Sequence, residues 1–163
     1  MAQNLNQFNQ TAVVGELDLQ TNPNPASFTV KFHDESATAA TTLLPGEGVK
    51  LIDLGGSDTI GVLPLVDERA AVTDALFGVK IFSTKKNAAV SGEIVQIAGK
   101  GAVMFLNSGA AIARGDSVSL VIGTPGNVIT NVATGEILGI ALDKAVGANE
   151  IIRVLIDIEG YAT

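Results

Sequence analysis

The sequence predicts an all-β protein, a small β-barrel or sandwich with at most one short helix. Three observations support this class: short runs alternate apolar and polar residues, turn-forming residues recur at intervals of roughly 8–12 residues, and only one segment carries helix signals. Hydrophobic residues make up 47% of the 163 residues and charged residues 17%, which argues against disorder. We expect an N-terminal arm, residues 1–27, followed by a single β domain, residues 28–163.

The N-terminal arm differs from the rest of the chain in composition. Six of its first ten residues are Asn or Gln, and Lys and Arg are absent through Ser27. The sequence "TNPNP" (Thr21–Pro25) interrupts regular structure. The arm is therefore either a floppy terminus or a segment that becomes ordered only against a partner.

The first strand is expected at "FTVKFH", where Phe28, Val30 and Phe32 share one face. A turn at Leu44–Gly48 precedes a second strand at Val49–Leu54. The next apolar run, Thr59–Val66, contains Pro64, which cannot donate to a β-ladder. This run is therefore expected to be an edge strand or an irregular segment.

One segment, Asp67–Gly78, is the candidate for the short helix, with its body near Asp67–Phe77. Asp67 could cap the amino end, Glu68 suits the first turn, and Gly78 could end the helix. The β-branched residues within it make the helix propensity only fair.

The remaining runs read as short strands bounded by Gly, Asn, Lys or Pro. They cover Val79–Ser83, Gly92–Ala98, Ala102–Leu106 and Ser117–Ile122.

The apolar stretch Ala133–Asp157 is rich in Gly and Ala, but it is expected to be scaffold and not a ligand-binding loop. The runs "EILGIAL" and "IIRVLIDI" flank a turn at Lys144–Asn149 and predict an antiparallel pair. In the second run Ile152, Val154, Ile156 and Ile158 share a face. Gly139 would allow a neighbouring strand to approach closely.

Residues for catalysis or metal binding are sparse. His33 is the only histidine, it is expected on the polar face of its strand, and the chain has no cysteine. The acidic residues form no metal-binding or metalloprotease motif. We therefore predict no catalytic, cofactor-binding or metal-binding residues, and we expect that the protein is not an enzyme.

Two short motifs are best interpreted as turns. "GTPGNV" (Gly123–Val128) lacks the GK[ST] ending of a phosphate loop, and Thr124–Asn127 fits a type II turn with Pro and Gly at its centre. "RGD" (Arg114–Asp116) introduces the strand that starts at Ser117, so a turn accounts for it better than an adhesion motif does.

The net charge of −7 would oppose binding to a phosphate backbone, so nucleic acid is not an expected partner. No apolar run approaches the roughly 18–20 residues that span a bilayer, and the start of the chain lacks the features of a signal peptide. We therefore expect no membrane partner. We expect that the protein is made in a cytoplasm.

Two stretches resemble the structural cement, or head decoration, proteins of tailed bacteriophages. The first is "FGVKIFSTKKNAAVSGEIVQIAGKGAVMFLNSGAAIARGDSVSL" (Phe77–Leu120). The second, "ATGEILGIALDKAVGANEIIRVLID", matches the closing pattern of that family. The resemblance covers Phe77 to Asp157, whereas the N-terminal half matches only loosely.

The resemblance implies a small β-barrel or β-tulip-like domain on the outer surface of a capsid, usually as a homotrimer. Such a protein would bind the major capsid protein after the shell has expanded and would reinforce the contacts between coat subunits. The family has no active site.

Two other classes of function stay open. A carbohydrate-binding β-module would need an aromatic platform, but the chain has only six Phe, one Tyr and no Trp. A trimeric hydrolase like the dUTPases would need Asp-Tyr and Ser-Ser-Gly elements, which are absent. The cement function is therefore favoured.

Overall fold

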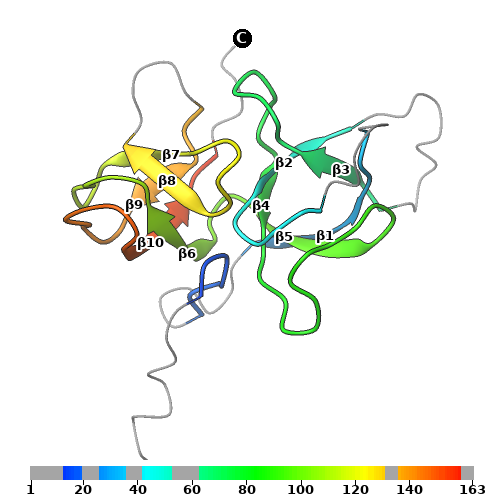
Figure 1. The fold of residues 1–163 in the computed structure, drawn as a ribbon, viewed down its shortest axis with the longest axis horizontal. Coiled ribbons are helices and arrows are strands. Elements are labelled where there is room, and N and C mark those ends of the chain that lie inside the picture. The colour runs from blue at the N-terminus through cyan, green and yellow to red at the C-terminus, as the bar shows by residue number, and fades with distance from the viewer. Residues whose placement is uncertain (1–12, 20–25, 36–41, 53–62, 131–135, 159–163) are drawn as a thin grey trace, which may run out of the picture.

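The computed structural model describes residues 13–19, 26–35, 42–52, 63–130 and 136–158. Within these ranges the chain has ten β-strands and no helix, which confirms the all-β class. The strands form two closed five-stranded barrels, which lie side by side in Figure 1. None of the described segments is a helix long and apolar enough to cross a bilayer.

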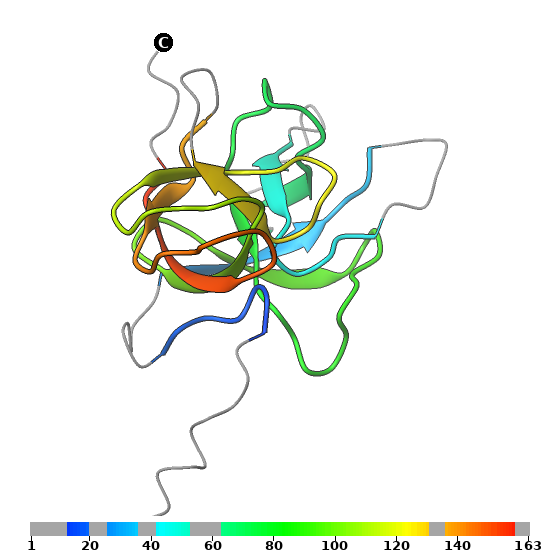
Figure 2. The same cartoon turned by 60° about the vertical axis from the view of Figure 1, so that its left-hand side comes forward.

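Barrel 1 is built from the first five strands and barrel 2 from the last five, as the two views in Figures 1 and 2 show. The strands of barrel 1 are β1 (Ser27–Phe32), β2 (Gly48–Leu51), β3 (Leu65–Glu68), β4 (Gly78–Lys80) and β5 (Ile94–Ala98). Those of barrel 2 are β6 (Val103–Ser108), β7 (Ser117–Leu120), β8 (Asn127–Thr130), β9 (Gly139–Ala141) and β10 (Ile151–Ile156).

The two barrels have the same topology. Around barrel 1 the strands follow the order β1-β3-β2-β4-β5, and around barrel 2 the order is β6-β8-β7-β9-β10. In each barrel the first and third strands are parallel, and every other pair is antiparallel. Barrel 2 therefore repeats barrel 1 strand for strand.

The repeat extends to individual hydrogen bonds in the turns. The turn before β2 is closed by the Glu47 carboxylate, which accepts the Leu44 N–H, and the turn before β7 is closed by the Asp116 carboxylate, which accepts the Ala113 N–H. The turn before β5 is closed by Glu93 and the turn before β10 by Glu150, which accept the N–H groups of Val90 and Gly147. Sequence reasoning missed this duplication. Its faint signals are "FGV…GEIVQI" against "LGI…NEIIRV".

Two apolar clusters fill the structure. The smaller cluster is the interior of barrel 1 and includes Val30, Phe32 and Ile97. The larger cluster is the interior of barrel 2, but it also contains Val79, Ala98 and Leu76 from the barrel 1 side. The core of barrel 2 therefore continues into the interface between the barrels, where Leu76, Val79 and Ala98 lie. We call this interface the seam.

Several sequence predictions about strand faces are confirmed. Ile152, Val154 and Ile156 are buried in barrel 2, as their shared face predicted. A Cβ atom on Gly139 would lie 1.9 Å from the Leu155 carbonyl oxygen, so this strand pair approaches as closely as expected. In β1, Val30 and Phe32 are buried, but Phe28 on the same face is 48% exposed.

The predicted helix is wrong. Asp67 and Glu68 lie in β3, opposite Lys50 and Val49 of β2. The following residues form a loop organised by Arg69, whose guanidinium donates to the carbonyl oxygens of Val72 and Asp74. Pairing with β2 and the Arg69 side chain satisfy backbone groups that a helix would have paired internally. These tertiary contacts override the local helix propensity.

Two strand predictions also need correction. Residues 59–62 of the run Thr59–Val66 lie outside the described residues. Pro64 is in an irregular segment just before β3, where its carbonyl oxygen accepts the Lys31 N–H, but Leu65 and Val66 belong to β3. β3 is not an edge strand, because β1 and β2 pair with it on either side. Strand β8 was not predicted at all. It is four residues long and directly follows the turn at Thr124–Asn127.

Part of the expected arm is ordered against the barrels. We call Val13–Leu19 the strap. Leu17 lies opposite Met104 of β6 in antiparallel orientation. Three backbone hydrogen bonds join the strap to β6: Gly15 N–H to the Phe105 oxygen at 2.8 Å, Phe105 N–H to the Glu16 oxygen at 2.9 Å, and Asp18 N–H to the Val103 oxygen at 2.8 Å. Residues 1–12 and 20–25 of the arm lie outside the described residues.

Candidate functional site: the seam and the exposed corners

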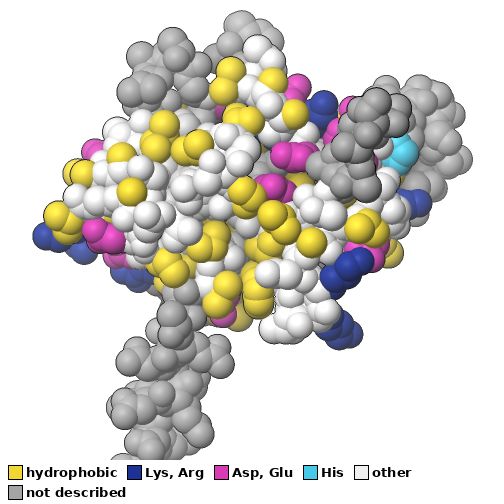
Figure 3. Space-filling model, viewed as in Figure 1, with side chains coloured by type: hydrophobic (Ala, Val, Ile, Leu, Met, Phe, Trp, Pro, Cys, Tyr) yellow, Lys and Arg dark blue, Asp and Glu magenta, His cyan; other side chains and the backbone are white. Residues whose placement is uncertain are grey.

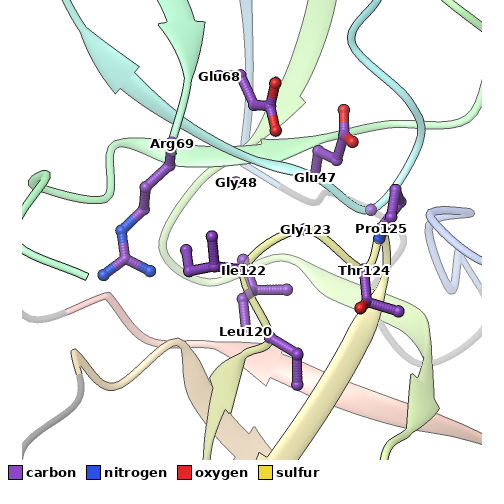
Figure 4. Close-up of a pocket in the computed structure, with 11 residues that line it drawn as sticks. Glu47, Gly48, Glu68, Arg69, Leu120, Ile122, Gly123, Thr124 and Pro125 are labelled. Carbon is purple, nitrogen blue, oxygen red and sulfur yellow. The ribbon is translucent and has the colours of Figure 1, made fainter. Parts of the chain in front are cut away.

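Residues at the seam line a small, partly open cavity of about 20 Å³. In Figure 4, Glu47, Glu68 and Arg69 line it from the barrel 1 side, and Leu120 and Ile122 line it from the barrel 2 side. A volume of this size holds about one water molecule. The cavity is therefore part of the packing between the barrels and has no room for a substrate.

The carboxyl groups beside this cavity have unusual acidity. Burial raises the pKa of Glu47 to about 7, with the Glu68 charge adding to the effect and Lys80 opposing it. Burial also raises the pKa of Glu68, and the charges of Asp67 and Asp34 contribute. Since charge is costly to bury, the seam shifts the titration of Glu47 from its usual acidic range to near neutral pH.

A buried ion pair spans the seam. Arg69, just after β3, places its Nη2 atom 3.1 Å from Oε2 of Glu136, which precedes β9, and each side chain is only 3% exposed. The Glu136 carboxylate also accepts the N–H of Leu76. These contacts fix the loop after β3 against barrel 2.

Two glycines allow the barrels to touch. The Gly126 N–H donates to the Gly46 carbonyl at 3.2 Å, and a Cβ atom on Gly46 would lie only 2.5 Å from the Gly126 Cα. Both residues have positive φ angles, which side chains rarely adopt. Gly126 also occupies the third position of the turn predicted at Thr124–Asn127, and that turn is confirmed by the hydrogen bond from Asn127 to Thr124.

Each barrel has an exposed apolar pair at the equivalent corner, which we call the apolar corners. In barrel 1 the pair is Val90 and Ile94, which are 41% and 66% exposed. In barrel 2 it is Val146 and Ile151, which are 79% and 40% exposed. Ile94 and Ile151 are the first residues of β5 and β10, so their positions match across the repeat.

An open groove adjoins each apolar corner. The groove of barrel 1, about 640 Å³, is lined by Lys85 and Lys86, and that of barrel 2, about 660 Å³, by Arg114 and Lys144. Figure 3 shows Lys and Arg side chains toward the two ends of the visible face. Glu93 also lines the first groove, where it pairs with Lys86 at 2.6 Å, and Asp116 also lines the second, so each groove combines apolar surface with cations and one carboxylate.

His33 follows β1, and its backbone N–H donates to the Val66 carbonyl oxygen. Among the described residues, no group of three or more His, Cys, Asp or Glu is arranged to hold a metal ion. The Arg114–Asp116 motif lies in the turn before β7, as predicted. There the Asp116 carboxylate accepts the Ala113 N–H at 2.9 Å, and Gly115 has a φ of +90°.

Structurally, the molecule is a tandem of two small β-barrels. No family model matches the chain, and no curated protein matches it. Among solved structures, the head fiber gp8.5 N base in bacteriophage phi29 has a similar fold, with a TM-score of 0.50 and 14% sequence identity. The alignment covers 85% of this chain and 98% of that chain. At this identity the likeness establishes the fold.

Proposed function

We propose that this protein is a structural protein of a bacteriophage virion that binds the outer surface of the capsid and strengthens the shell. The observation that carries the proposal is the fold: nearly the whole of a phage head fiber base aligns with 85% of this chain. The resemblance of Phe77–Asp157 to cement proteins supports the same function. The partner is then the major capsid protein.

The apolar corners are the surfaces best suited to this contact. When a partner covers exposed aliphatic side chains, the free energy of the complex falls by roughly 25 cal/mol per Å² of apolar area removed from water. Two equivalent corners on one chain suit a partner that presents identical subunits side by side, as a capsid does. Lys85, Arg114 and Lys144 in the adjoining grooves would face acidic groups on the coat.

Binding strengthens the shell by linkage. A protein that binds only the expanded shell stabilises it by an amount that grows with the ratio of free protein to dissociation constant, about 2.7 kcal/mol per site at a hundredfold excess. Such sites are repeated over the particle. A homotrimer would add avidity, because the first attached subunit raises the effective concentration of the others.

The test is co-sedimentation with expanded and unexpanded capsids, together with the temperature at which the capsids disassemble. The intact protein is expected to bind expanded capsids and raise that temperature. Replacing the barrel 2 corner (Val146→Ser with Ile151→Ser) should weaken binding at least tenfold. Val72→Ser is the matched control, since Val72 is 57% exposed but lies outside the corners.

Two results would count against this proposal. If the intact protein does not bind capsids, the function is wrong. If the corner variant and the Val72→Ser control bind equally well, another surface makes the contact.

A further inference from the structure

The first half of β5 has an open edge in barrel 1. The Ile81 N–H donates to the Gln96 carbonyl oxygen at 3.0 Å, which is the last hydrogen bond between β5 and the chain that follows β4. The same register would place Ser83 opposite Ile94, but no strand forms there. Because backbone groups alternate along a strand, the Ile94 N–H and C=O point to the same side as the Gln96 carbonyl. Within the described part of the chain, no backbone group pairs with Ile94 on that side.

Two contacts hold the chain away from this edge. We call residues 82–88, which are all described, the β4–β5 loop, and Figure 1 shows it projecting from barrel 1. At its start the Phe82 N–H donates to the Gly15 carbonyl of the strap at 2.9 Å. Toward its end the Asn87 carbonyl accepts a hydrogen bond at 2.9 Å from Nζ of Lys80, a buried side chain. The loop is fixed at both ends, so the groove of about 640 Å³ that it forms with β5 is preformed.

The equivalent edge in barrel 2 is capped. There the Leu142 N–H donates to the Arg153 carbonyl oxygen, which matches the last hydrogen bond on the β5 edge. Asp143 then covers the edge, because its carboxylate accepts the Arg153 backbone N–H at 3.0 Å and pairs with the Arg153 guanidinium. The matching residues in barrel 1 are Phe82 and Gln96, which form no such cap. The open edge is therefore a property of barrel 1.

An open strand edge binds an extended polypeptide, which adds to the sheet through backbone hydrogen bonds. The side chains around the edge determine which segment fits. Ile94 is 66% exposed, so an aliphatic residue suits the position across from it in an added strand. Lys85 lines the groove and forms no ion pair with the described residues, whereas Lys86 pairs with Glu93 at 2.6 Å. The complementary segment therefore carries an aliphatic residue and an acidic one.

We propose that the β5 edge binds an extended, acidic segment of the major capsid protein as an added strand. The choice of the coat as the source rests on the proposed function. Ile94 belongs to the apolar corner of barrel 1, so the edge continues the surface that would face the coat. A second copy of this chain fits less well, because copies that each carry a net charge of −7 repel one another.

Hydrogen–deuterium exchange tests the added strand directly, on the intact protein free and bound to expanded capsids. Mass spectrometry with fragmentation resolves single amides. In the free protein the Ile94 amide should exchange fast, because no backbone group pairs with it. On capsids its exchange should slow by about tenfold or more. The Val95 amide is the control, since it faces β1 within barrel 1 and should be protected in both states.

Substitutions at the edge test its contribution to affinity. Ile94→Pro removes the N–H that faces the groove and leaves the hydrogen bonds between β5 and β1. Ile94→Val keeps the N–H and is the matched control. In co-sedimentation with expanded capsids, the Pro variant should bind at least tenfold more weakly than the Val variant. Circular dichroism and a urea midpoint check that both are folded, and the exchange measurement does not depend on Ile94→Pro folding.

A charge substitution tests the acidic character of the segment. Lys85→Gln should weaken capsid binding several-fold. Lys100→Gln removes the same charge outside the groove, where Lys100 pairs with Asp157, and should bind like the intact protein. Equal binding by these two variants would contradict an acidic segment at Lys85.

The results separate this inference from the proposed function. An intact protein that binds capsids while the Ile94 amide exchanges as in the free state overturns the inference alone. A folded Ile94→Pro variant that binds like Ile94→Val does the same. Protection of Ile94 without capsids that grows with protein concentration would assign the edge to a second copy. An intact protein that does not bind capsids overturns the function, and this inference with it.

Discussion

Arg69 and Glu136 form an ion pair of 3.1 Å across the seam, and each side chain is only 3% exposed. Arg69 follows a strand of barrel 1 and Glu136 precedes a strand of barrel 2, so the pair joins segments 67 residues apart in the sequence. The Glu136 carboxylate also accepts a hydrogen bond from the backbone N–H of Leu76. The pair therefore couples the two barrels.

Replacing Glu136 by Ala should lower the free energy of unfolding by about 3–5 kcal/mol, because Arg69 would stay buried without its counter-charge. Urea denaturation measures this change. Lys100→Ala is the control. Its pair with Asp157 is exposed, so its loss should cost at most about 1 kcal/mol. Equal effects of the two substitutions would show that the seam pair contributes no more than a surface pair.

Stability should fall as the pH rises through neutrality, partly because of Glu47. Burial raises its folded-state pKa to about 7, above the usual 4.5. Because the folded state binds the Glu47 proton more tightly than the unfolded state does, Glu47 contributes its full stabilisation below pH 4.5. This stabilisation is lost as the pH rises through 7. Since Glu47 is partly solvated, we expect a loss of about 1–2 kcal/mol between about pH 5 and pH 8.

Glu47→Gln should remove most of this pH dependence, because a neutral amide does not titrate and can still accept the Leu44 N–H. Comparing urea midpoints of the two proteins at the acidic and basic ends of this range measures the effect. Parallel pH profiles would mean that Glu47 titrates normally.

Gly139→Ala should destabilise the protein by about 3 kcal/mol or more, because the added methyl group meets the Leu155 carbonyl and the backbone must move. Gly147→Ala is the matched control, since nothing lies within 4 Å of an added Cβ there. Thermal denaturation should place the control within about 0.5 kcal/mol of the intact protein. A stable Gly139→Ala variant would show that β9 and β10 can separate at little cost.

Deleting Ala2–Gln10 should leave a folded protein that binds expanded capsids more weakly than the intact one, because the Asn- and Gln-rich arm is expected to pair with the coat and to become ordered only there. Circular dichroism checks the fold, and co-sedimentation measures the affinity. If the truncated protein binds as tightly, the segment is only a floppy terminus.

Replacing His33 by Ala should leave both the fold and capsid binding intact. Its backbone N–H provides the contact to Val66, which the substitution keeps. Capsid co-sedimentation and a urea midpoint test this. Lost binding with an unchanged fold would give His33 a role that neither its sequence context nor its position explains.

The sequence by itself determined the all-β class and many of the turns. The alternation around Val30 and Phe32, the Pro-Gly turn ending at Asn127, and the tight approach at Gly139 all follow from local chemistry: side chains alternate along a strand, and glycine alone fits certain backbone positions. Such properties depend on neighbouring residues only, and the structure reproduces them.

The tertiary structure alone decided the number of barrels, the conformation of Asp67–Gly78 and the position of the strap on β6. Asp67 and Glu68 are in a strand because their backbone pairs with β2. Arg69 forms its ion pair with Glu136, which is distant in the sequence. Pairings over such separations depend on which strands meet in space, which local propensity does not encode. The strap joins β6 by backbone hydrogen bonds between segments that lie far apart in the sequence, a contact that arises only when the barrels are folded.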